Sequence, residues 1–118
     1  MRLLREDGSV VCDSCVLADT PLRRMKGLLG RSDLPRGHGL LIRPASSIHM
    51  WFMKFPIDAV FLDSGLTVLR IRPDLRPWAM AGCRGAKAVL ELPAGESERR
   101  GLEAGDRLVL EPPPKGDE

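Results

Sequence analysis

The apolar positions of this chain fall into short runs that are separated by turn residues. Between residues 40 and 110 these runs lie at 40–42, 48–55, 59–62, 67–72, 88–92 and 106–110. Two shorter apolar pieces, at 10–11 and 16–18, lie beside a pair of cysteines. Apolar runs of this length that are rich in β-branched and aromatic residues predict strands rather than helices. The chain therefore predicts a mainly β fold.

One segment has the spacing of an amphipathic helix. Apolar residues recur there at Leu22, Met25, Leu28 and Leu29. Thr20 can cap the free amides of this helix, and Pro21 suits its first position. We expect the helix to end at Gly30. Gly27 inside it costs about 1 kcal/mol relative to alanine, which indicates either close packing or an earlier end.

The connections favour a curved sheet. Asp63-Ser64-Gly65 is typical of a hairpin turn, with Gly65 available for a positive φ. Two prolines and two glycines at 73–85 predict a long loop or an irregular edge, and one or two helical turns fit 95–102. Because no helix lies between successive strands from 40 to 72, we expect a mainly β (α+β) fold. Its architecture would be a small curved antiparallel sheet or barrel with two short helices.

Size and charge limit the choices further. The 118 residues fit one domain, which we place at 1–111, followed by a Pro-rich tail at 112–118 that we expect to be disordered. The net charge is only +2, but six Lys or Arg stand against one Asp at 20–43, whereas eight acids stand against four bases at 88–118. An anionic partner would therefore meet the middle of the chain.

The start of the chain becomes charged too soon for a signal peptide, and no apolar run approaches the length of a membrane span. We therefore expect a cytoplasmic protein without a membrane partner. The sequence gives no indication of the oligomeric state.

Three cysteines, an odd number, exclude a complete internal disulfide framework, and we expect all three to be reduced. Cys12 and Cys15 have the spacing of redox pairs and zinc knuckles, and Cys83 with His38 or His49 could complete four ligands. No second motif of this kind supports such a site. We therefore expect neither a metal nor another cofactor.

The most unusual segment is 49–58, His-Met-Trp-Phe-Met-Lys-Phe-Pro-Ile-Asp. Polar groups amid so much apolar surface cost roughly a few kcal/mol each unless they are paired. His49, Lys54 and Asp58 must therefore find partners, ligands or water. For His49 the alternatives are a core histidine bonded to a backbone carbonyl and a base or ligand in a pocket.

Two arginines near the end of the predicted helix can capture a carboxylate or a phosphate. Glu91 stands in an apolar strand, where alternation predicts that it faces outward; facing inward, it would form a buried pair opposite Arg31. We expect one pocket that takes an anionic small molecule. Its candidate lining residues are His49, Trp51, Lys54, Asp58, Arg24 and Arg31.

Several motifs, taken together and in this order, resemble the DUF192 (UPF0127) family. They are Ala18-Asp-Thr-Pro21, Gly27-Leu-Leu-Gly-Arg31, Gly39-Leu-Leu41, the segment 49–58 and Val89-Leu-Glu-Leu-Pro-Ala-Gly95. The resemblance covers residues 10 to 110 and implies a single small, largely β domain of unknown function. It brings no catalytic residue with it. This chain lacks the Asn that the commoner family pattern places before Pro-x-Asp.

No nucleotide-binding loop, zincin motif or hydrolase elbow occurs in the chain. We predict a small soluble module that binds a small ligand or a protein partner through a pocket around 49–58. The main alternative is an enzyme that uses His49 and Asp58 in general acid/base roles. Nucleic-acid binding through the basic surface at 23–43 is disfavoured, because the aromatic residues are not interleaved with basic residues.

Overall fold

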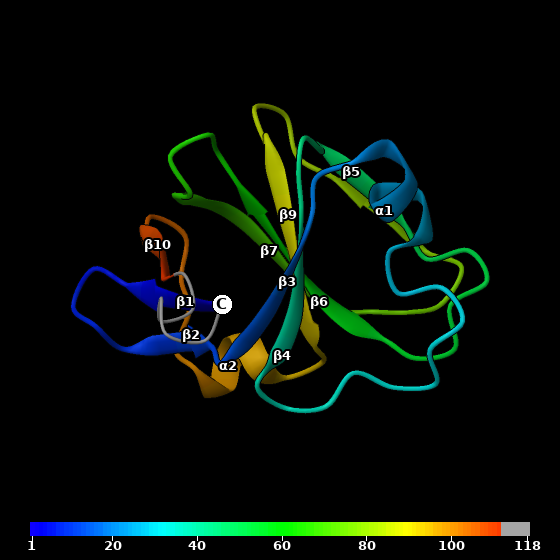
Figure 1. The fold of residues 1–118 in the computed structure, drawn as a ribbon, viewed down its shortest axis with the longest axis horizontal. Coiled ribbons are helices and arrows are strands. Elements are labelled where there is room, and N and C mark those ends of the chain that lie inside the picture. The colour runs from blue at the N-terminus through cyan, green and yellow to red at the C-terminus, as the bar shows by residue number, and fades with distance from the viewer. Residues whose placement is uncertain (112–118) are drawn as a thin grey trace, which may run out of the picture.

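The computed structural model describes residues 1–111 and, within that range, every side chain except that of Met25. The chain folds into three sheets with two short helices (Figure 1). The predicted mainly β class with two short helices is confirmed, and the sheets do not close into a barrel. The tail expected at 112–118 lies outside the described residues.

The central sheet has five strands in the order β3–β4–β9–β6–β7. These strands are β3 (Ser14–Ala18), β4 (His38–Ile42), β9 (Ala88–Pro93), β6 (Ile57–Leu62) and β7 (Val68–Leu75). The β3–β4 pair is parallel, and the other pairs are antiparallel. Every residue of β6 and β9 is buried, as is usual for strands that are covered on both faces.

A three-stranded sheet covers one face of the central sheet. It consists of β1 (Arg2–Arg5), β2 (Val10–Cys12) and β10 (Leu108–Glu111), in the order β10–β1–β2. Leu3 and Leu108 from this sheet are buried against Leu41, Val60 and Leu90 of the central sheet. The apolar runs between residues 40 and 110 therefore do not all belong to the one curved antiparallel sheet that we expected, because β10 lies in the three-stranded sheet. The last strand leaves that sheet to bury its apolar face with the first strand.

The opposite face of the central sheet is covered at the other end of the molecule (Figure 1). Here lie α1 (Pro21–Lys26) and the two-stranded sheet of β5 (Ser47–His49) and β8 (Met80–Gly82). The second helix, α2 (Glu96–Arg99), follows β9. Alternation along β6 separates the two faces, because Phe61 belongs to this core and Val60 to the other.

The first helix begins as predicted and ends early. The side chain of Thr20 accepts a hydrogen bond from the Arg23 amide, and Pro21 occupies the first turn. Gly27, not Gly30, ends the helix, with φ of 48°. That left-handed backbone favours glycine, which explains why the helix stops there. In the predicted hairpin the positive φ falls on Leu66, at 65°, rather than on the expected Gly65.

The strand predicted at 48–55 ends at His49, and a turn replaces its second half. The amide of Met53 donates to the carbonyl of Met50 over 3.2 Å, and Phe52 has φ of 66°. A second turn joins Arg76 to Ala79 over 3.1 Å and places Trp78 at φ of 70°. Both aromatic residues occupy the third position of a type II turn, where glycine is preferred, at a cost of roughly 1–2 kcal/mol each.

The close contact between the sheets predicts an effect of a single methyl group. A Cβ added at Gly39 on β4 would lie 2.8 Å from Cys12 Sγ and 3.2 Å from the Glu91 carbonyl oxygen. We expect Gly39→Ala to lower the free energy of unfolding by about 1–3 kcal/mol because of this overpacking. Urea denaturation measures the change.

Gly65→Ala is the matched control, because its added Cβ would meet only Asp63 Oδ1, at 3.5 Å. Its free energy of unfolding should change by no more than about 0.5 kcal/mol. Equal unfolding midpoints for the two variants would contradict the packing described for β4.

Candidate functional site

A cavity of about 530 Å³ lies between α1, β5 with the turn that follows it, and the central sheet. Its apolar lining includes Leu28, Leu29, Ile42, Ile48 and Met53. Its ionisable lining residues are Arg24, Lys26, His49 and Glu91. A concave apolar space with a few polar groups has the composition of a small-molecule site.

Glu91 is the buried acid of this cavity. Its side chain projects from β9 between Leu40 on β4 and Ala59 on β6, and Glu91 is only 6% exposed. Among the described side chains it forms no ion pair. Burial raises the pKa of Glu91 to about 7. The carboxyl group therefore changes its charge near neutral pH.

The prediction that Glu91 faces outward is wrong. Alternation identifies an outward side only when one face of a sheet is open, and β9 is covered on both faces. The inward alternative placed Arg31 opposite it, but Arg31 is exposed and lines a neighbouring hollow of about 420 Å³. Glu91 and Arg31 therefore do not form a buried pair.

Arg24 contributes a second polar group with incomplete bonding. Its Nη1 donates to the carbonyl of Pro44 over 3.1 Å, which holds the side chain against the start of the β5 segment. Its Nε is buried and has no hydrogen-bond partner among the described side chains and backbone. A buried donor without a partner costs about 1–3 kcal/mol, so a ligand acceptor at this position would stabilise the protein.

His49 and Trp51 lie at the rim of the cavity. Their rings are stacked, with centroids 4.5 Å apart and planes inclined by 28°. Both residues are exposed, so the alternative of a core histidine is wrong. The reason is the turn after β5, which carries this end of the segment away from the core.

The structure does not bring Asp58 to the cavity. Asp58 is completely buried on the opposite face of β6 and accepts hydrogen bonds from backbone and side-chain donors. The donors are the amides of Asp74 (2.9 Å), Gly95 (3.2 Å) and Ser97 (3.0 Å) and the Ser97 hydroxyl (2.6 Å). This carboxylate joins the end of β7 and the start of α2 to β6, which is a structural role.

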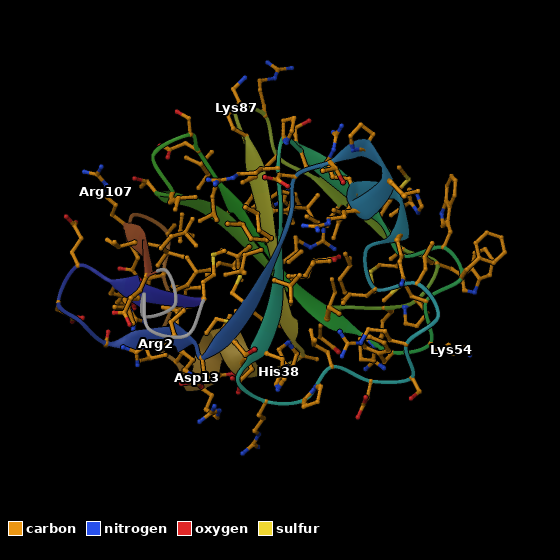
Figure 2. All side chains as sticks on the ribbon, in the orientation of Figure 1. Arg2, Asp13, His38, Lys54, Lys87 and Arg107 are labelled. Carbon is orange, nitrogen blue, oxygen red and sulfur yellow. The ribbon has the colours of Figure 1, made fainter. Side chains whose placement is uncertain are left out.

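Lys54 does not line the cavity either. It is exposed at the end of the molecule that lies opposite Arg2 (Figure 2). Of the six candidate residues, the structure places Arg24, His49 and Trp51 together, and Glu91 joins them. The sequence signal for Glu91 was an acid within an apolar strand, but its direction depends on what covers the sheet.

The cysteines are free thiols and are divided between the two cores. Cys12 and Cys15 are buried in the core beneath β1 and β2, whereas Cys83 packs against the other core. Within residues 1–111, no three His, Cys, Asp or Glu side chains are grouped so that they could hold a metal ion. The zinc alternative therefore has no assembled ligand set in this part of the chain.

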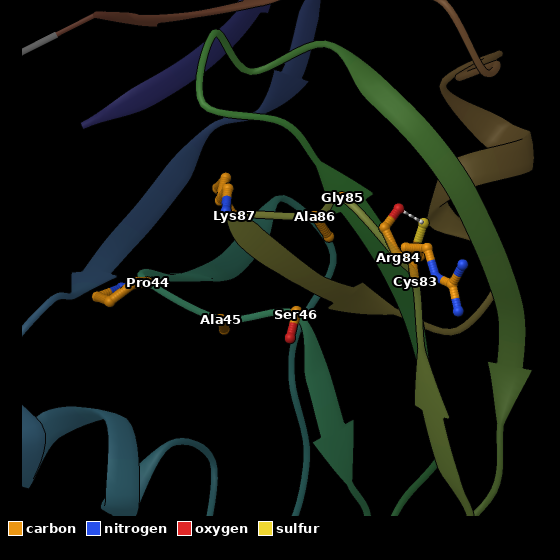
Figure 3. Close-up of a pocket in the computed structure, with 8 residues that line it drawn as sticks. All are labelled: Pro44, Ala45, Ser46, Cys83, Arg84, Gly85, Ala86 and Lys87. Atoms are coloured by element: carbon orange, nitrogen blue, oxygen red, sulfur yellow. Dashed lines mark hydrogen bonds between the residues drawn. The ribbon is translucent and has the colours of Figure 1, made fainter.

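A larger hollow of about 680 Å³ lies between the segments 44–46 and 83–87 (Figure 3). It is shallow, and its basic residues Arg84 and Lys87 are exposed. In the close-up these two side chains lie apart and point in different directions. Because it contains no buried ionisable group, we place the candidate site in the cavity of Glu91.

The chain belongs to the DUF192 family, described as "Uncharacterized ACR", whose sequence pattern matches residues 3–110. A UPF0127 protein of Thermococcus sibiricus is 31% identical over 94% of this chain and 75% of its own length. A UPF0127 protein of Pyrococcus abyssi is 33% identical over 90% of this chain and 94% of its own. The names of these relatives state no activity.

A solved structure supports the same assignment. The crystal structure of a Novosphingobium aromaticivorans protein of unknown function has a TM-score of 0.79 and 25% identity, covering 92% of this chain and 82% of that one. None of the helices within residues 1–111 has the length and apolar character needed to cross a membrane. The comparisons therefore establish the family. The role of the cavity has to be inferred from its lining residues.

The hydrogen bonds of Asp58 predict a large loss of stability on their removal. Asp58→Ala leaves the amides of Asp74 and Ser97 without their acceptor, and each buried unpaired donor costs about 1–3 kcal/mol. We expect the free energy of unfolding to fall by at least about 3 kcal/mol in urea denaturation. Asp19→Ala, at an exposed position, is the control and should change it little.

The pKa of Glu91 predicts how stability depends on pH. An unfolded Glu has a pKa near 4.5 and the folded one about 7, so the folded state binds more protons between these values. Stability from this group is therefore greatest below pH 4.5, falls as the pH rises to 7, and is constant above it. Glu91→Gln removes this dependence.

Relative to Glu91→Gln, the wild type should lose about 3 kcal/mol of stability between pH 4.5 and 8. Urea denaturation at each pH measures the difference. Glu98→Gln, at an exposed position of α2, is the control and should follow the wild type. Parallel curves for Glu91→Gln and the wild type would contradict the burial of Glu91.

Proposed function

We propose that the protein binds a small anionic molecule with an apolar body in the cavity of Glu91. One observation carries the proposal: within residues 1–111, Arg24 Nε has no hydrogen-bond partner and Glu91 forms no ion pair, and both residues line the same largely apolar space. Native proteins rarely leave buried polar groups without partners unless a ligand or water completes them. The volume of about 530 Å³ lies within the usual range for ligand sites.

The lining residues suggest the chemistry of the ligand. The guanidinium of Arg24 presents donors for a carboxylate or phosphate, and Lys26 adds a second positive charge at the same cavity. Glu91 would pair with a hydroxyl or amine of the ligand, as donor when protonated and as acceptor when ionised. The apolar body would lie against Leu28 and Met53.

A second candidate function is an enzyme with Glu91 as its general acid/base. A carboxyl with a pKa of about 7 is suited to proton transfer at neutral pH. This alternative replaces the predicted roles of His49 and Asp58, because Asp58 is occupied by its own hydrogen bonds. The binding function is favoured, since among the described residues neither Ser46 nor Ser47 of the cavity is hydrogen-bonded to His49, as an activated nucleophile would be.

A panel of carboxylates with apolar bodies, such as benzoate, indole-3-acetate and decanoate, tests the binding proposal. We expect at least one of them at millimolar concentration to raise the melting temperature by several degrees, because a ligand that binds only the folded state stabilises it. Arg24→Ala should abolish this shift. Differential scanning fluorimetry and calorimetric titration measure both effects.

Arg107→Ala, which removes an exposed arginine from the opposite end of the molecule, is the matched control and should keep the shift (Figure 2). A shift that survives Arg24→Ala would show that the ligand binds elsewhere. No shift with any carboxylate would remove support for an anionic ligand. Turnover of a bound compound that Glu91→Gln abolishes would favour the enzyme.

A further inference from the structure

Four exposed apolar side chains gather at the end of the molecule that carries β5 and β8. They are Trp51 (44% exposed), Phe52 (71%), Trp78 (61%) and Met80 (64%), and we call them the aromatic tip. The rings of Phe52 and Trp78 are 5.0 Å apart, which shows that the two turns present one surface. Both tryptophans of the chain lie here. Exposed apolar groups of this size, gathered together, mark interaction sites.

The backbone holds the aromatic tip in place. The carbonyl of Met50 accepts from the amides of both Met53 (3.2 Å) and Trp78 (2.8 Å), and the Met50 amide donates to Ala79 (2.7 Å). The side chain of Met50 is completely buried in the core. The backbone of one buried residue therefore holds together the two turns that carry the exposed rings.

The charge close to the aromatic tip is mainly basic, and its exposed acidic neighbour Asp74 is held in an ion pair. The segments 44–57 and 76–82, which carry the tip, contain no acidic residue. Lys54 lies two residues after Phe52 in the sequence and is exposed. Lys26 lines the same cavity as Phe52. Arg76 is paired with Asp74 over 2.9 Å. The remaining basic groups would attract an anionic surface.

We propose that the aromatic tip docks onto a bilayer that contains anionic lipids. Tryptophan and phenylalanine rings are suited to the headgroup region, a thioether to its apolar boundary, and lysines to anionic headgroups. Such surface binding needs no membrane-spanning helix. It departs from the sequence expectation of no membrane partner, because that expectation considered only signal peptides and apolar spans.

Two other occupants fit the aromatic tip less well. A second copy of the chain would bring two tips of the same charge together, which is unfavourable. Single-stranded nucleic acid needs aromatic faces along a basic groove, whereas Met80 has no ring and the rings stand on two separate turns. The proposal does not depend on the ligand proposed for the cavity.

Tryptophan fluorescence tests the proposal directly, because both tryptophans belong to the tip. With phosphatidylcholine vesicles that contain phosphatidylserine, we expect a blue shift and co-sedimentation of the full chain, both weakened by salt. Phosphatidylcholine alone should give little of either. Phe52→Gly should weaken binding at least about fivefold while keeping both reporters.

Phe52→Gly suits the positive φ at this position, so it should keep the fold, which circular dichroism verifies. Its control is Val109→Gly, which removes an exposed apolar side chain from β10 at the other end of the molecule. Lys54→Ala should weaken binding about fivefold, and its control Arg107→Ala less than twofold.

Four results would overturn the proposal. The first is no blue shift with anionic vesicles, and the second is a shift that Phe52→Gly leaves unchanged. The third is a concentration-dependent dimer that Phe52→Gly converts to a monomer, because the aromatic tip would then be a contact between copies of the chain. Quenching by a single-stranded oligonucleotide without vesicle binding would likewise assign the surface to nucleic acid.

Discussion

Strand β9 is paired on both sides and covered on both faces, and this burial determines where the candidate cavity and its acid lie. Its neighbours are β4 and β6, and two separate cores cover its faces. Any polar residue within β9 must therefore enter one of the cores, because the strand has no open face. Glu91 enters the core beneath α1. The cavity exists because that core does not close completely around the carboxyl group.

The two buried carboxyl groups of the central sheet differ in how far the surrounding protein satisfies them. Asp58 and Glu91 lie on adjacent strands but on opposite faces of the sheet. Asp58 accepts hydrogen bonds from backbone amides in two directions and from the Ser97 hydroxyl, so the protein itself satisfies its oxygens. Within residues 1–111, Glu91 receives no comparable side-chain hydrogen bond or ion pair, and burial raises its pKa to about 7.

Local signals in the sequence identified most elements and failed where distant contacts decide. Thr20 and Pro21 gave the start of α1, because capping involves only neighbouring residues. The end of β5 could not be predicted from local residues. Phe52 has a positive φ, which favours glycine, and the hydrogen bonds of Met50 hold the turn in that conformation. The direction of Glu91 likewise depends on what covers β9. The pairing of β10 with β1 joins the two ends of the chain, and no local pattern indicates it.

The candidate cavity and the aromatic tip meet at Trp51 and Phe52, which line the one and belong to the other. A surface that docks there would lie next to the mouth of the cavity. The chemistry proposed for the two sites agrees. The ligand proposed for the cavity and an anionic lipid both combine an apolar body with an anionic group. The turn at 50–53 would then connect the sites physically. Because Met50 fixes that turn through backbone hydrogen bonds and burial, substitutions at Trp78 and Met80, which are exposed and do not line the cavity, can separate the two proposed functions without disturbing the fold.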